Sequence, residues 1–574
     1  MESNISINRL LDRLDEAKRR FGGRESSETG RTLRLIAQRR FKDAESLMRF
    51  HEALLFVRAH PPNRSVLNFV ETQLKTFTAR VAQLHKNDAD LTSLEDPEVS
   101  GIAGTSVTSN FSYEIIRWLV ATHPSQVAID WDWFDDEDRL GAIGPRFMPL
   151  LEEDAIVEAN IPYLEWLRAA KGRQKDLAWL IGRFEALDLP AQATAELYDS
   201  LKLHVCWTPS FRATRTGMKL PVRKIFYHDK PLISRREVSL AAELNSPPFT
   251  IKRLSPVQGE RILDLARETS ATRYRELHGF TYGDPGKVLH ANVGRGVDLY
   301  FNGVPPERRL PLRAYHSAMI FKNGIPVGYF EGLSLFERME SGFNFYYTFR
   351  EGETAWIYAR VLRLCRQLLR VTAISIDPYQ VGYENEEGIE SGAFWFYRKL
   401  GFRPVRPELL KLTIAEEKKI AERKGYRTRA GALRKLAKGH MLFQVPSEED
   451  PAKGARALRT EWDRFQVRNL GLAVQRRMAA DFKGDANSIR SASVQYVKEA
   501  LNLRTSNWND AELRALDDLA LLLAQIQGME KWSKDEKTQA SKIIRAKAGR
   551  DEAGYLRLMQ KHPRLRKEMI RLGS

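Results

Sequence analysis

The sequence predicts an α+β protein in which a central domain with a mixed sheet is flanked by two mostly α-helical regions. Three observations lead to this fold class. Strand and helix patterns alternate from about residue 248 to 410, the residues before 205 show helical spacing of apolar side chains, and the residues after 410 are helical and highly charged. At roughly 100–200 residues per domain, a chain of 574 residues suggests about three to five domains. We therefore expect a helical region at 1–205, a basic connecting segment at 206–247, the mixed-sheet domain at 248–410 and a basic helical region at 411–574.

The N-terminal region is predicted to be helical from the spacing of its apolar residues. In the stretch 39–60, Leu47, Phe50, Leu54 and Val57 recur at near-helical intervals, and the following Pro-Pro-Asn sequence ends the pattern. Similar patterns occur at 111–122, 153–170 and 176–187.

The connecting segment is basic and contains aromatic residues. Its cations are interleaved with Phe211, Phe226 and Tyr227, and the pair Pro247-Pro248 marks its end. The cations are Arg212, Arg215, Lys219, Arg223, Lys224 and Lys230.

The central domain can be followed element by element. The sequence Lys322-Asn323-Gly324 predicts a hairpin turn between two strands, because Asn-Gly favours the backbone conformation of a tight turn. Gly401 is the expected terminator of the last helix. In chain order, we expect a strand at 249–256, a helix at 257–277, two strands within 317–335, an aromatic strand at 342–349, a turn at 350–355, a helix at 356–370, a strand at 374–382 and a helix at 391–400.

This order of elements resembles the GNAT superfamily of acyl-CoA N-acyltransferases over about residues 248–410. The hairpin at 320–333 looks like the central meander of that family. The run Ala393-Phe394-Trp395-Phe396-Tyr397-Arg398-Lys399-Leu400-Gly401-Phe402 matches the family's terminal motif, Ala-x-x-Phe-Tyr-x-x-x-Gly-Phe. The resemblance implies transfer of an acyl group from acyl-CoA to an amine.

The same resemblance implies a binding site for the CoA pyrophosphate at the start of the helix after the turn. Elementary physics agrees, because the first N–H groups of a helix are unpaired and the helix dipole is positive there. Glu351 and Glu353 must point away from a bound anion. The expected cofactor-binding residues are Arg350, Glu351, Gly352, Glu353, Thr354 and Ala355, with Phe345 and Tyr347 on the preceding strand.

The resemblance also implies catalytic roles. Tyr397 falls on the tyrosine that often protonates the departing thiolate, and the strand Phe343–Thr348 would donate a backbone hydrogen bond to the thioester carbonyl. For the base we consider Glu331 and Asp377, with His316 behind them. Neither Cys206 nor Cys365 falls in the predicted site strands, so we expect direct transfer in a ternary complex. We expect no metal.

Two alternatives stay open. Glu390 stands where the family usually has Asn, and the turn lacks a Gly-x-Gly pattern, so the donor is either acyl-CoA or an acyl-carrier-protein arm. The net charge of +17 favours a polyanionic partner such as nucleic acid or tRNA, although a solvated basic face is the simpler interpretation. A non-enzymatic nucleic-acid-binding protein, with basic stretches at 212–236 and 411–438 and a degenerate GNAT-like scaffold, is therefore the second hypothesis.

The remaining expectations concern the location and assembly of the chain. Two cysteines cannot form a disulfide framework, and the first residues lack the apolar core of a secretory signal. No stretch approaches the ~18 apolar residues of a membrane span. We therefore expect a cytoplasmic protein with an unknown amine acceptor, whose helical regions recognise that acceptor or form an oligomer.

Overall fold

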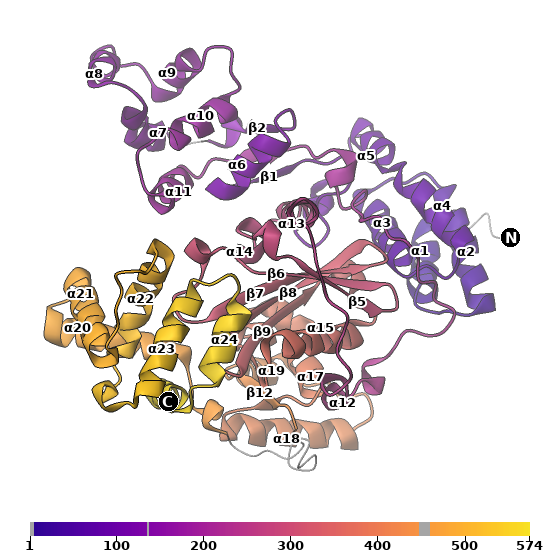
Figure 1. Cartoon of the computed structure of the whole chain (residues 1–574). Helices are drawn as coiled ribbons and strands as arrows, with labels where there is room; N and C mark the ends of the chain where they lie inside the picture. Colours follow the sequence, from indigo (N-terminus) through magenta and orange to yellow (C-terminus); the bar gives the residue numbers. More distant parts are fainter. Residues whose placement is uncertain (1–4, 135–136, 447–459) are drawn as a thin grey trace.

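The computed structural model describes residues 5–134, 137–446 and 460–574. A large mixed sheet lies at the centre, helices α1–α5 lie beyond one end of it, and the C-terminal helices lie at the other (Figure 1). The predicted α+β fold class, with a mixed sheet and flanking helical regions, is therefore confirmed.

Nine strands of the described chain form the central sheet, in the order β11-β12-β10-β9-β8-β7-β6-β5-β4. Strands β9 and β10 run parallel, and the other neighbouring pairs are antiparallel. The strands are β4 Lys252–Arg253, β5 Leu289–Gly294, β6 Val297–Asn302, β7 Ala314–Lys322, β8 Ile325–Leu335, β9 Arg338–Phe345, β10 Ala373–Ile376, β11 Arg403–Pro404 and β12 Met441–Gln444.

The predicted hairpin turn joins β7 to β8. Asn323 and Gly324 have φ angles of 50° and 80°, the left-handed pair that an Asn-Gly turn supplies. A side chain at 324 would begin 2.3 Å from the carbonyl oxygen of Leu220, whose N–H donates to the Gly324 oxygen at 2.8 Å. The turn therefore needs glycine both for its conformation and for close contact with the connecting segment.

The strand predicted at 342–349 is displaced in the structure. Strand β9 starts at Arg338 and ends at Phe345, and Tyr347–Phe349 form a 3-10 turn, η9. The first half of β9 carries the charged residues Arg338 and Glu340, so its sequence does not have the apolar pattern of a buried strand. The strand therefore includes a carboxylate that the sequence analysis did not assign to it.

Helices cover both faces of the sheet. On one face, the N–H of Gly279 in α14 donates to the Tyr315 hydroxyl at 2.9 Å, and on the other Tyr358 of α15 shares a 2.9 Å hydrogen bond with Ser341. Helix α24 packs beside α15. The helices around the sheet are α12 Leu240–Leu244, α13 Pro256–Ala271, α14 His278–Thr281, α15 Thr354–Leu369, α16 Glu386–Glu390, α17 Ala393–Arg398, α18 Pro407–Glu422 and α19 Ala430–Leu436.

The N-terminal region consists of two parts. Helices α1–α5 share a hydrophobic core with the sheet, whereas residues 107–207, together with Ala213 and Ala271, form a second core around the small sheet β1-β3-β2 (Figure 1). The elements of the first part are α1 Ile7–Ala17, α2 Gly23–Ala37, α3 Ala44–Ala59, α4 Arg64–Leu74 and α5 Phe77–Lys86. Those of the second are β1 Val107–Ser109, α6 Tyr113–Thr122, β2 Val127–Ile129, α7 Glu137–Ile143, α8 Leu150–Glu158, α9 Tyr163–Ala170, α10 Asp176–Glu185, α11 Ala191–Ser200 and β3 Val205–Trp207.

The C-terminal region also adds to the central domain. Strand β12 lies between β10 and β11, so the central sheet extends beyond residue 410. A strand of four residues is too short to show a clear alternation of apolar and polar side chains. The helices that follow it are α20 Val467–Phe482, α21 Ala486–Leu501, α22 Asp510–Leu523, α23 Lys534–Lys547, α24 Glu552–Gln560 and α25 Pro563–Gly573. Across the three described ranges, no helix combines the length and the apolar character needed to cross a membrane.

Candidate functional site

A cavity of about 740 Å³ opens where β9 and β10 separate. The two strands pair only from Arg338 to Glu340 on β9, and β9 then continues to Phe345 with β8 as its remaining strand neighbour. The far half of β9 and the segment after β10, including Gln380, line opposite sides of the cavity. The cavity thus lies beside an edge of β9 whose peptide groups have no strand partner in the described chain.

The first turn of α15 forms the next wall, with Gly352, Thr354 and Ala355 lining the cavity. The backbone N–H groups of Thr354, Ala355 and Trp356 donate to no other group of the described chain. Such a helix start attracts anions, because both the free N–H groups and the helix dipole are positive there. Three of the predicted loop residues therefore lie where an anion can bind.

The glycine at 352 has a structural reason. A side chain there would begin 3.0 Å from Nε2 of His60 and 3.0 Å from the carbonyl oxygen of Phe349. His60 is buried, and its Nε2 has no hydrogen-bond partner among the described residues. Glycine therefore lets the turn lie directly against the end of α3.

The two glutamates of the turn do not line the cavity. Glu351 forms an exposed ion pair with Arg19 at 2.6 Å. The Glu353 carboxylate is fully buried behind the turn, 3.1 Å from Lys322 and 2.5 Å from Arg295. Each carboxylate is thus neutralised by a cation of its own.

Arg350 lines the cavity, but carboxylates already contact its guanidinium. It pairs with Glu387 of α16 and, at 3.2 Å, with Glu98. Arg275 completes a ring of alternating charges, at 3.1 Å from Glu98 and 3.3 Å from Glu387. Arg350 therefore links the turn to α16, and two carboxylates already balance its positive charge.

The strand residues predicted to bind the cofactor separate in the structure. Phe345 is buried at the end of β9 and lines the cavity. Tyr347 is 54% exposed on η9 and is not among the cavity-lining residues. The early end of β9 accounts for the difference.

Tyr397 lines the cavity from α17 and is 3% exposed. Its hydroxyl forms no hydrogen bond with another described residue, so it is available to a ligand. Burial raises the pKa of Tyr397 well above its usual value. The phenol therefore stays protonated at neutral pH.

Two of the predicted bases lie outside the cavity. Glu331 on β8 accepts a hydrogen bond from the Tyr315 hydroxyl, and burial raises its pKa. His316 lies on the opposite face of the sheet, near Glu552 of α24, and burial lowers its pKa to about 4. Glu331 and His316 therefore lie on opposite faces of the sheet, and neither lines the cavity.

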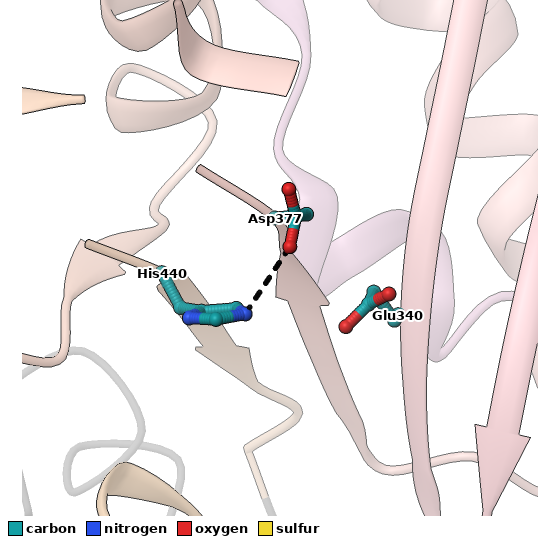
Figure 2. Close-up of side chains that lie close together, drawn as sticks. All are labelled: Glu340, Asp377 and His440. Carbon is teal, nitrogen blue, oxygen red and sulfur yellow. Dashed lines mark ion pairs between the residues drawn. The ribbon is translucent and has the colours of Figure 1, made fainter. Parts of the chain in front are cut away.

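Asp377 lies at the end of β10, where Glu340 of β9 and His440 from the start of β12 meet it (Figure 2). Its Oδ2 is 3.4 Å from Nε2 of His440. Burial alone would raise the pKa of Asp377, but His440 and the Tyr379 N–H lower it below its usual value. Since Tyr379 and Gln380 line the cavity, Asp377 is the predicted base that lies nearest to it along the chain.

The three side chains of this cluster also resemble a metal-ligand set, because their ligand atoms lie within 4.8 Å of one another. Two neighbouring arginines disfavour a metal ion at this cluster, because their positive charges repel it. Arg313 lies 3.5 Å from Glu340, and Arg338 donates to Ser375, which pairs with Glu340 across the two strands. The two arginines already offset the negative charge of the carboxylates, which makes the cluster less attractive to a divalent cation.

A buried network fixes the approach to the turn from the N-terminal region. Glu52 of α3 pairs with Arg215 at 2.7 Å and accepts hydrogen bonds from His51 and from Thr348 of η9. Burial alone would raise the pKa of Glu52, but Arg215, His51 and Thr348 lower it to about 2. The segment between β9 and α15 is therefore held in place by α3 and the connecting segment.

The sequence analysis missed the site residues that come from distant segments. Glu340 and His440 were missed because the first half of β9 and strand β12 were not predicted. Arg235 of the connecting segment was also missed, and it lines the cavity from a 3-10 turn, η6 (Arg235–Glu237). The sequence shows that the connecting segment is basic, but it does not show that this segment lies beside α15.

We compared the chain with known proteins. No protein-family model, no curated protein and no solved structure matches it.

Proposed function

We propose that the chain is an N-acyltransferase that binds an acyl-CoA in the cavity between β9 and β10. One observation carries the proposal: the free N–H groups that begin α15, the unpaired edge of β9 and the Tyr397 hydroxyl all meet at one cavity. These are the groups that acyl transfer from a thioester requires. The resemblance of Ala393–Phe402 to the GNAT terminal motif supports the same function.

In this proposal the donor lies along the gap between the strands. The pyrophosphate would accept hydrogen bonds from Thr354, Ala355 and Trp356, while a peptide N–H of β9 would stabilise the thioester oxygen as negative charge develops on it. A cavity of about 740 Å³ has room for an extended chain and an acceptor group.

The proton transfers are assigned to two residues. The amine attacks the thioester carbon, the carbon–sulfur bond breaks, and Tyr397 protonates the departing thiolate. A thiol of pKa about 8.5 is a stronger acid than a phenol of pKa about 10, and burial raises the pKa of both groups, so the transfer depends on a hydrogen bond prearranged between the Tyr397 hydroxyl and the departing sulfur. Asp377, beside His440 and Glu340, takes the proton that the amine loses.

Direct transfer fits the positions of the cysteines. Cys365 is buried in α15, and burial strongly raises the pKa of its thiol, so it is a poor nucleophile. Cys206 lies on β3 in the separate core of residues 107–207. Neither lines the cavity.

A transfer assay tests this function. The protein is incubated with acetyl-CoA and a panel of amines, and free CoA is measured with a chromogenic disulfide. We expect thiol release that depends on one class of amine and falls about 100-fold in Tyr397→Phe. Release that is independent of every amine and unchanged in the variant would contradict the assignment.

A second candidate function is nucleic-acid binding, because a basic surface lies between α18 and α19. Its exposed cations have no carboxylate within 4.0 Å in the described part of the chain: Arg423, Lys424, Arg427 and Arg429. If this surface binds phosphates, neutralising three of the cations reduces the slope of log affinity against log salt by about three. An unchanged slope would exclude this surface as the binding site.

A further inference from the structure

Three cations lie close together beside the cavity, and one of them, Arg235, lines it. Arg235 and Arg236 belong to η6, and Lys399 follows α17. Arg235 lines the cavity and its Nη1 donates to the backbone oxygen of Lys399 at 3.4 Å. Two segments separated by more than a hundred and fifty residues in sequence thus bring like charges together.

These charges lack the carboxylate partners that other cations of the cavity have. Arg350 and Arg275 share Glu98 and Glu387, but no carboxylate of the described chain lies within 4.0 Å of Arg235, Arg236 or Lys399. The nearby Glu237 turns back to accept a hydrogen bond from the Ser234 N–H at 2.7 Å. Burial and the neighbouring charges of Arg235 and Arg236 lower the pKa of Lys399, in keeping with the short distance between the two segments.

The cations lie close to the anion-binding start of α15. The turn η6 packs against α15, and the N–H of Ile233 donates to the Glu353 carboxylate at 3.2 Å. The connecting segment is therefore fixed beside the first turn of α15. Arg235 and the first turn of α15 line the same cavity, so a ligand with two separate phosphate groups can contact both.

We propose that Arg235, Arg236 and Lys399 form a second phosphate site, which binds the phosphomonoester on the ribose of coenzyme A. The inference rests on the proposed function and makes it more specific. Coenzyme A carries this phosphate in addition to its pyrophosphate, whereas the phosphopantetheine arm of an acyl-carrier protein has no nucleotide. The site therefore selects a free CoA thioester as the acyl donor.

The test compares CoA with dephospho-CoA, which lacks only the ribose phosphate. Affinities are measured by isothermal titration for the wild-type chain, for the double variant Arg235→Ala/Lys399→Ala and for Arg223→Ala. Arg223 is an exposed cation of the same connecting segment that does not line the cavity. We expect the wild-type chain and Arg223→Ala to bind CoA at least about tenfold more tightly than dephospho-CoA.

The double variant should bind the two ligands equally to within about twofold, and its affinity for dephospho-CoA should match the wild type. Equal affinities in the wild-type chain would overturn the second phosphate site while leaving the proposed function intact. An equal loss for both ligands in the double variant would also overturn it, because the residues would then support the cavity in general. Binding of neither ligand to the wild-type chain would refute the proposed function itself.

Discussion

Replacing Glu52 with Gln tests whether α3 holds the segment that leads into the cavity. In the folded chain the pKa of Glu52 is lowered from 4.5 to about 2. At about 1.4 kcal/mol for each pH unit, this difference corresponds to about 3 kcal/mol of stabilisation at neutral pH. The variant also leaves the fully buried Arg215 side chain without its carboxylate, a change that costs about 3–5 kcal/mol in other proteins.

The assay has to be local, because a chain with separate cores does not unfold in one step. Hydrogen exchange of peptides that cover 44–59 and 346–350 measures the free energy of opening on both sides of the network. We expect Glu52→Gln to lower that free energy by about 3 kcal/mol at pH 7. The matched control is Glu351→Gln, which removes an exposed ion pair with Arg19 and should change it by well under 1 kcal/mol.

The pH dependence of the same variant gives a second result. Because the folded pKa of Glu52 is depressed, its stabilisation is present above pH about 4.5 and is lost as the pH falls towards about 2. The difference between the variant and the wild type should therefore shrink over this range. Equal protection of both peptides at pH 7 would refute the role of the network, and a difference that does not depend on pH would refute its electrostatic origin.

Three further predictions concern the cavity. Tyr397→Phe should lower turnover about 100-fold with unchanged affinity for acyl-CoA in a titration; a loss of affinity instead would make Tyr397 a packing residue. Asp377→Asn should lower turnover by a similar factor and remove the acidic limb of the pH–rate profile, whereas Glu331→Gln should keep that limb. The reverse result would make Glu331, and not Asp377, the general base. Gly352→Val places a side chain against His60 and should cost about 1–3 kcal/mol of stability by thermal unfolding, so a neutral effect would show that the turn can move away.

The parts of the fold that sequence could predict are those with strong local signals. The pair Asn323-Gly324 predicted a turn, the helical spacing of apolar residues predicted α13 and α15, and Gly401 predicted the end of the helix in the terminal motif. Strand β12 escaped because its apolar run, Met441–Val445, follows a basic helical stretch and is too short for its periodicity to separate a strand from a buried part of a helix. Its place in the sheet depends on pairing with β10, which lies more than sixty residues earlier in the chain.

The candidate site was predictable only where one segment supplies it. The turn Arg350–Ala355 and Tyr397 come from elements with recognisable patterns, and they meet at the cavity. Glu353 was predicted as part of the binding turn, with a carboxylate that must point away from a bound anion. Its partner Lys322 lies on the β7–β8 hairpin, so no local pattern could show where that carboxylate goes. The charge ring of Arg350 and the cations around Arg235 likewise arise from tertiary contacts that no single segment encodes.

The binding of acetyl-CoA and of a longer acyl-CoA to the whole chain, measured by isothermal titration beside the variant Gly352→Trp, tests the central claim most directly. Saturable binding of both thioesters with micromolar affinity is the predicted result. Folded Gly352→Trp should lose it, because the side chain has no room between the turn and His60 and must displace the residues that lead into α15. An absence of binding by wild-type protein that is shown to be folded would contradict the account.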